Sequence, residues 1–168
     1  MKAEKMSRIE LDAIDLRILA ALQSNARVSN VDLAKLAGLS PTPCLRRIRR
    51  LEEAGVIAGY SVRLDREKTG LSMTVFVHIS LENRDPKHVE NFHRAVAPIP
   101  EVVTYHALTG QHDFLLEVVV PDWRRFTELM LGQLGGLPGV KDIYSTVVLE
   151  TFKQPRALPL PGAGTRTG

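Results

Sequence analysis

The sequence predicts an α+β protein, in which a helical N-terminal unit precedes a four-stranded sheet covered on one face by two helices. Up to residue 60 the apolar side chains recur at helical spacing, and after residue 73 alternating β-rich runs are separated by two amphipathic helices. The polar run Asp65–Gly70 lies between these patterns and ends on a glycine. We therefore expect a domain over residues 1–60, a linker over 61–72, a second domain over 73–153 and an irregular tail over 154–168.

Two helices are predicted ahead of Gly38, which supplies the left-handed position that stops the second of them. Asp12 or a neighbouring residue can open the first helix, which ends near Asn25. Ser29 can cap the second, with Asp32 completing an acidic variant of the capping box. The apolar residues expected to pack are Ile14, Ile18, Leu19 and Leu22 in the first helix and Val31, Leu33, Ala34, Leu36 and Ala37 in the second.

A third helix is predicted after a tight turn. Ser40 can cap it, and Pro41 and Pro43 lie in its first turn, where no helical hydrogen bond is lost. Gly55 marks its end. Two short helices joined by a glycine turn, the second rich in arginine, are typical of a helix-turn-helix that presents a recognition helix to DNA. The apolar stripe of this helix comprises Cys44, Leu45, Ile48 and Leu51, and its arginines project elsewhere.

The arginines of the third helix admit two interpretations. A charge run on a helix is commonly a solvated face. No acidic residue lies between Asp32 and Glu52, however, so the segment carries Lys35 and four arginines, five positive charges. Thr42, near the helix start, suits a phosphate or a base edge. We therefore favour double-stranded DNA as the partner, with expected contacts from Ser40, Thr42, Pro43, Arg46, Arg47 and Arg50.

The composition, with 44% apolar and 24% charged residues, is that of an ordinary globular protein. Residues 1–60 hold ten Lys and Arg against seven Asp and Glu, whereas residues 61–168 hold twelve of each. The net charge of +3 therefore belongs to the half expected to meet phosphate. No run of about 18 apolar residues and no signal-peptide core occurs, so we expect a cytoplasmic protein without a membrane segment.

Residue types that support catalysis or metal binding do not cluster in the sequence. The single Cys44 excludes an internal disulfide and a multi-cysteine zinc site, and we expect it to serve packing. No HExxH pair, Walker loop or GxGxxG run is present. We therefore expect no enzyme, no cofactor and no metal site. The histidines are scattered over His78, His88, His93, His106 and His112.

The second half of the chain reads as β-α-β-β-α-β, the split βαβ or ferredoxin-like arrangement. Asp122 is the expected N-cap of its second helix, and proline residues end the first. The two central strands are separated by a short hairpin connection. The predicted elements are, in order, strand Met73–Leu81, helix His88–Ile99, strands Val102–Gly110 and Phe114–Val120, helix Trp123–Leu137 and strand Val140–Thr151.

Two helices can cover only one face of such a sheet. The other face is expected to carry apolar strand residues in whichever register points outward, and an open apolar face invites pairing with a second copy of the chain. We therefore expect an obligate homodimer. The residues considered for this face are Val75, Val77, Leu116, Val118 and Val147.

Three stretches of the chain closely resemble the Lrp/AsnC regulators: LDAIDLRILAALQSNARVSN, LAGLSPTPCLRRIRRLEEAGVIAGY and TGQHDFLLEVVVPD followed by LPGVKDI. The resemblance spans residues 10 to about 153. It implies a bacterial or archaeal transcription factor with a winged-type helix-turn-helix and an amino-acid-binding βαββαβ module. It also implies dimers that often assemble into tetramers or octamers and bind a small effector between subunits.

The resemblance implies an effector site at the loop between the second and third strands of the module. There Asp113 can accept the ammonium group of an amino acid and backbone N–H groups around Gly110 can meet its carboxylate, although Asp113 can equally be a turn-capping residue. Apolar wall positions favour a hydrophobic amino acid, whereas Gln111 and His112 can instead select a polar or sulfur-containing one. An architectural DNA-organising protein without a specific effector is the alternative. The implied site residues are Leu108, Thr109, Gly110, Gln111, His112, Asp113, Trp123, Ser145, Thr146 and Val147.

Overall fold

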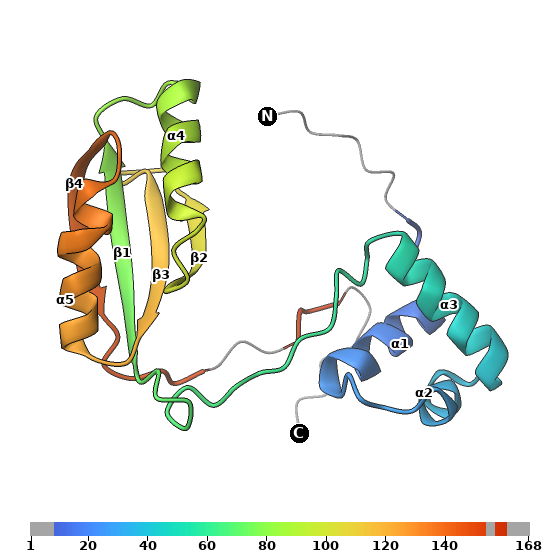
Figure 1. Ribbon diagram of the computed structural model, residues 1–168. Helices are drawn as coiled ribbons and strands as arrows, with labels where there is room; N and C mark the ends of the chain where they lie inside the picture. The colour runs from blue at the N-terminus through green and yellow to red at the C-terminus, as the bar shows by residue number, and fades with distance from the viewer. Residues whose placement is uncertain (1–8, 154–156, 161–168) are drawn as a thin grey trace. The chain divides into compact units, whose positions relative to one another are not determined.

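The computed structural model describes residues 9–153 and 157–160 of the 168-residue chain. The chain forms two compact units (Figure 1). The helical unit comprises the described residues up to Val62 together with those that follow Phe152. The sheet unit comprises Arg63–Phe152. The C-terminal segment is therefore part of the helical unit, which the sequence did not predict.

The helical unit contains helices α1 (Ala13–Ser24), α2 (Asn30–Ala37) and α3 (Pro41–Glu53). Asp12 caps α1 as predicted, because its carboxylate accepts the N–H groups of Ile14 and Asp15. Ser29 caps α2 through the N–H of Asp32, and Gly38 ends it at a φ of +73°. All three helices lie where they were predicted, and the capping bonds predicted for α1 and α2 are confirmed.

The core of the helical unit is formed by one face of each helix, including the fully buried Ile18, Leu33, Cys44 and Leu51. Three residues predicted to pack are instead exposed. The eight-residue α2 turns only its Leu33, Ala34 and Ala37 side inward, so residues on its other side face water. The exposed residues are Val31 at 50% and Leu36 at 63% in α2, and Leu45 at 39% in α3.

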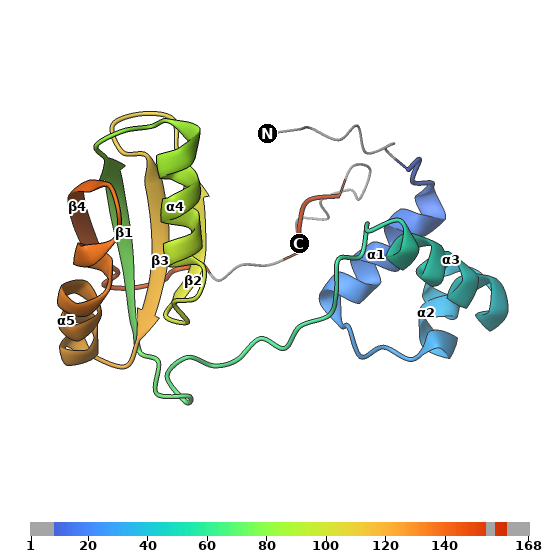
Figure 2. The ribbon, with the colours of Figure 1, turned by 45° about the horizontal axis from the view of Figure 1, so that its top comes forward.

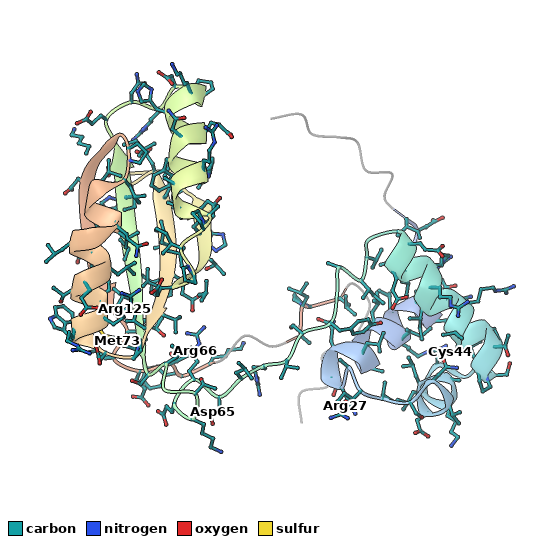
Figure 3. All side chains as sticks on the ribbon, in the orientation of Figure 1. Arg27, Cys44, Asp65, Arg66, Met73 and Arg125 are labelled. Atoms are coloured by element: carbon teal, nitrogen blue, oxygen red, sulfur yellow. The ribbon has the colours of Figure 1, made fainter. Side chains whose placement is uncertain are left out.

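The segment after α3 is an extended connector. Tyr60, Val62 and Leu64 alternate as a strand would, yet they are exposed and pair with no strand. The part of the helical unit that the structure describes therefore contains helices and no β-wing. The predicted polar turn is present, with Gly70 at a φ of +76°. Arg66 in this turn (labelled in Figure 3) belongs to the sheet unit, and its Nη2 lies 2.9 Å from a carboxylate oxygen of Glu117 in β3.

The sheet unit is a four-stranded antiparallel sheet with the strand order β2-β3-β1-β4, as the ferredoxin-like prediction requires. Helices α4 and α5 lie on the same side of it in both views (Figures 1 and 2). A short 3-10 turn, η1, follows α5. The elements are β1 (Met73–Leu81), α4 (Pro86–Val96), β2 (Val102–Ala107), β3 (Phe114–Val120), α5 (Trp123–Gly132), η1 (Leu134–Gly136) and β4 (Val140–Val147).

The register corrects the prediction for the open face of the sheet. Val75, Val77, Leu116 and Val118 are fully buried beneath the helices, and Val147 pairs with Val75 and shares that face. Both faces of the strands carry apolar residues, so period-two alternation alone could not assign them. The open face instead carries the intervening positions: Thr74, Phe76, His78, Ser80, Thr104, His106, Leu115, Glu117, Tyr144 and Thr146.

Candidate DNA-binding face and effector loop

The start of α3 presents two hydroxyl groups to solvent. Ser40 occupies the N-cap position, but its side chain makes no capping hydrogen bond, which corrects the prediction. Such a bond comes from the N–H of the second or third helical residue, and Pro43 in third place has none. Ser40 and Thr42 are both exposed, and neither hydroxyl bonds to any residue that the structure describes. They are available to a phosphate.

Three side-chain stripes run along α3, as helical spacing requires. The first is the core stripe of Cys44, Ile48 and Leu51. The second contains Pro43, Arg47 and Arg50. The third, which we call the recognition stripe, contains Thr42, Arg46 and Arg49, all exposed.

The second stripe of α3 forms ion pairs with acidic residues at the start of α1. Arg47 Nη1 lies 2.7 Å from a carboxylate oxygen of Asp12 and 2.8 Å from one of Asp15, and Arg50 Nη2 lies 2.5 Å from the other oxygen of Asp15. Asp15 is completely buried. The N–H of Asp15 and then the guanidinium of Arg47 lower the pKa of Asp12 to about 2. A buried carboxylate requires such partners, so these arginines hold the helical unit together.

The sequence analysis assigned Arg47 and Arg50 to DNA, and the structure places both in ion pairs with the acids of α1. Arg46 and Arg49 form no ion pair with any described residue, so they are the cations of α3 that are available to DNA. The sequence analysis included Arg46 and missed Arg49. The signal that could have found Arg49 is its spacing of seven residues from Thr42 and three from Arg46, which places all three on one face.

The β2–β3 loop, Leu108–Asp113, is held at both ends. The N–H of Leu108 donates to the carbonyl of Asp113 at 2.8 Å, and Gly110 adopts a φ of +137°. Asp113 accepts the N–H of Leu81 at 2.8 Å on one carboxylate oxygen and pairs with Arg84 Nε at 2.6 Å on the other. Both oxygens of Asp113 are therefore engaged within the chain. These contacts give Asp113 a structural role in joining the loop to the end of β1, and neither partner is an N–H group of the loop itself.

His112 joins the loop to the open face of the sheet. Its Nδ1 lies 3.2 Å from the hydroxyl of Ser80, and its ring stacks on Tyr144 with an interplanar angle of 7°. His78 lies next to both rings, 5.0 Å from His112 and 5.8 Å from Tyr144 between centroids. The remaining loop residues, Thr109, Gly110 and Gln111, are exposed.

The structure does not bring the other implied effector residues to this loop. Trp123 follows the far end of β3, a strand of seven residues that spans roughly 20 Å. Ser145, Thr146 and Val147 pair with the first half of β1, whereas the loop adjoins its last residues. Trp123 is 61% exposed. One chain therefore holds the implied site as two separate parts.

The described residues hold neither a cluster of metal-ligating side chains nor a helix that could span a membrane. Nowhere in residues 9–153 and 157–160 do three or more His, Cys, Asp or Glu side chains gather as metal ligands would. Within the same ranges, every helix is too short or too polar to cross a membrane.

Comparison with known proteins gives matches over both units. Residues 11–58 match a family model described as winged helix-turn-helix DNA-binding, and residues 74–158 match one described as the Lrp/AsnC ligand binding domain. A leucine-responsive regulatory protein of Haemophilus influenzae is 42% identical over 95% of this chain and 96% of its own. The protein of that name from Escherichia coli is 44% identical over 89% and 91%.

Solved structures show the same likeness in three dimensions. A transcriptional regulator from Neisseria meningitidis, solved as an L-Met complex, superposes with a TM-score of 0.85 at 37% identity. The match covers 89% of this chain and 97% of that one. An AsnC family transcriptional regulator from Agrobacterium tumefaciens gives a TM-score of 0.84 at 36% identity, with the same coverage.

Proposed function

From the premise that this chain belongs to the Lrp/AsnC family of transcriptional regulators, we propose that it binds pseudo-palindromic DNA through paired α3 helices and responds to a free amino acid. The single observation that carries the DNA part is the division of the α3 arginines. Arg47 and Arg50 form ion pairs with acids of α1. Arg46 and Arg49 are exposed on the stripe that contains Thr42.

The recognition stripe suits the major groove. Recognition helices read bases with residues near their N-terminus, while hydroxyl groups at the helix start contact phosphate. Arg46 and Arg49 are one helical turn apart and reach outward together, and Ser40 and Thr42 precede them. We assign base or phosphate contacts to the two arginines and phosphate contacts to the hydroxyls. Because this partner is chromosomal DNA, we place the protein in the cytoplasm.

The effector proposal rests on the separation of the site into two parts. A site that includes both the β2–β3 loop and Trp123 must combine one subunit's loop with another subunit's α5, because each chain holds them at opposite ends of its sheet. The Neisseria regulator described above was solved with L-Met. We therefore propose a hydrophobic or sulfur-containing amino acid, bound between subunits, with Asp113 shaping the loop and backbone N–H groups near Gly110 meeting the carboxylate.

Trp123 offers a clean test of this site, because a side chain 61% exposed in one chain adds little to its stability. We expect L-Met or L-Leu to raise the melting temperature of the wild type, and Trp123→Ala to weaken that ligand at least about tenfold. Leu131→Ala, at an 82% exposed position of the same helix, is the matched control and keeps full affinity. A thermal-shift screen of the twenty amino acids measures this. If none stabilises the wild type, the effector proposal fails and the DNA-organising alternative remains.

The assembly proposal is a homodimer formed through the open sheet face, with tetramers or octamers built from it. Leu115 is at the centre of that face, between His78 and His106 in register. We expect Leu115→Arg to dissociate the dimer at micromolar concentration, because like charges would meet across a two-fold axis without water. Leu131→Arg adds the same charge to the opposite, helical side and leaves the assembly intact. Light scattering that shows an unchanged mass for Leu115→Arg would contradict this interface.

A further inference from the structure

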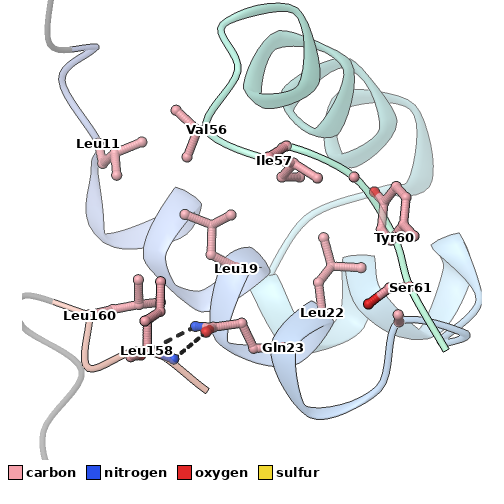
Figure 4. A pocket seen from close by; sticks show the side chains of 13 residues that line it. Leu11, Leu19, Leu22, Gln23, Val56, Ile57, Tyr60, Ser61, Leu158 and Leu160 are labelled. Atoms are coloured by element: carbon pink, nitrogen blue, oxygen red, sulfur yellow. Dashed lines mark hydrogen bonds between the residues drawn. The ribbon is translucent and has the colours of Figure 1, made fainter. Parts of the chain in front are cut away.

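An apolar groove of about 510 Å³ lies on the helical unit (Figure 4). One wall is α1 with the residue before its cap, and another is the connector that follows α3. No residue of the recognition stripe lines it. The side chains that make it apolar are Leu11, Leu19, Leu22, Val56, Ile57 and Tyr60.

The third wall of the groove is supplied by the C-terminal segment. Gln23 of α1 binds the backbone of Leu158 twice: its Nε2 donates to the Leu158 carbonyl at 3.4 Å, and the Leu158 N–H donates to its Oε1 at 2.5 Å (Figure 4). One side-chain amide thus satisfies both backbone groups of a residue in an extended segment, as a neighbouring strand would. The side chain of Leu158 itself is 74% exposed, so the contact is with its backbone.

Leu160 provides the apolar part of the contact. Its side chain is partly buried and packs against the core of the helical unit. Pro159 lies between the two contact residues; it has no N–H that needs a partner, and its ring fixes φ. A segment stiffened in this way loses less conformational entropy when it docks. The helical unit thus binds the backbone of Leu158 and the side chain of Leu160, two residues later, as a site for a short extended peptide would.

We propose that residues 157–160 of the same chain are a dedicated wall of this groove and act as a strap on the DNA-binding unit. The chain leaves the helical unit after Val62 and returns to it after Phe152, so a docked strap connects the two units by two chain segments instead of one. The groove excludes the recognition stripe, so the strap and DNA can be bound at the same time. Covalent attachment supplies the high effective concentration that a contact of this size needs.

Cross-linking tests which chain supplies the strap. In a Cys44→Ala background, Ala26→Cys and Leu158→Cys place two thiols on the groove, and neither change removes the Gln23 contact with the Leu158 backbone. A short bismaleimide is expected to join the two thiols within one chain, which migrates as a monomer on a denaturing gel. The control pair is Ala26→Cys with Leu149→Cys, whose leucine is 98% exposed in the sheet unit. A predominant link between two chains, or yields equal to the control pair, would overturn the proposal.

Hydrogen exchange of the full chain tests the contact energy. We expect Leu160→Ser and Gln23→Ala each to speed amide exchange in α1 and in residues 56–60 by about fivefold to thirtyfold. Leu158→Ser should change exchange much less, because that side chain is exposed and its backbone bonds remain. Leu149→Ser is the matched control. Exchange in Leu160→Ser that equals the control would refute the strap.

Discussion

Replacing Arg47 and Arg50 together by methionine is expected to lower the free energy of unfolding of the helical unit by about 3–5 kcal/mol. The change leaves the carboxylate of Asp15 completely buried without either of its cationic partners. Hydrogen exchange of α1 and α3 amides in the full chain measures the loss, since it reports on this unit separately from the sheet unit. DNA binding falls with it, because the recognition stripe is no longer held in place.

A third substitution separates the structural role from direct contact with DNA. Adding Asp15→Leu to the double variant removes the stranded carboxylate, and replacement of a whole buried ion cluster by apolar residues is often neutral or stabilising. We expect both stability and most DNA affinity to return in Arg47→Met/Arg50→Met/Asp15→Leu. Restored folding without DNA binding would show that Arg47 or Arg50 contacts DNA directly, contrary to our assignment.

Replacing Arg46 and Arg49 by alanine is expected to give the largest loss of DNA affinity without loss of stability. Each base-reading arginine contributes about 1–3 kcal/mol, which is roughly fivefold to 150-fold in the dissociation constant. Both side chains are exposed and form no ion pair with a described residue, so their removal leaves the helical unit folded. Fluorescence anisotropy with a DNA site selected from a random pool measures the affinity.

The salt dependence of the same titrations tells the two kinds of contact apart. A phosphate-binding arginine weakens all sequences alike and reduces the salt slope by about one when removed, whereas a base-reading one relaxes specificity at a single position. Arg124→Ala removes the same charge from an exposed site on α5 and is the matched control. Affinities of Arg46→Ala and Arg49→Ala that equal this control would refute the recognition stripe.

In the sheet unit, local sequence patterns predicted the bounds of some elements and not of others. The bounds of β1 and β3 agree with the prediction, because both strands are β-rich runs flanked by polar turns. The run after Val147 was also expected to be a strand, but β4 ends at Val147, and one further backbone bond, from the N–H of Val148 to the carbonyl of Thr74, follows it. The helix predicted to reach Leu137 ends at Gly132, because the glycines that follow favour other conformations.

The sequence by itself determined the order of elements, the capping residues Asp12, Ser29 and Asp122 and the presence of a recognition helix, because those depend on neighbours within a few residues. It also placed Arg46, Arg47, Arg49 and Arg50 outside the apolar stripe. Only the tertiary structure decided which arginines remain available to DNA. Asp15 lies 32 residues before Arg47, and the packing of α1 against α3 brings the two together. The buried carboxylate of Asp15 requires cationic partners, and the guanidinium groups of Arg47 and Arg50 are the ones within reach. A residue distant in sequence therefore gives two of the α3 arginines a structural role and leaves Arg46 and Arg49 for our proposed DNA contacts.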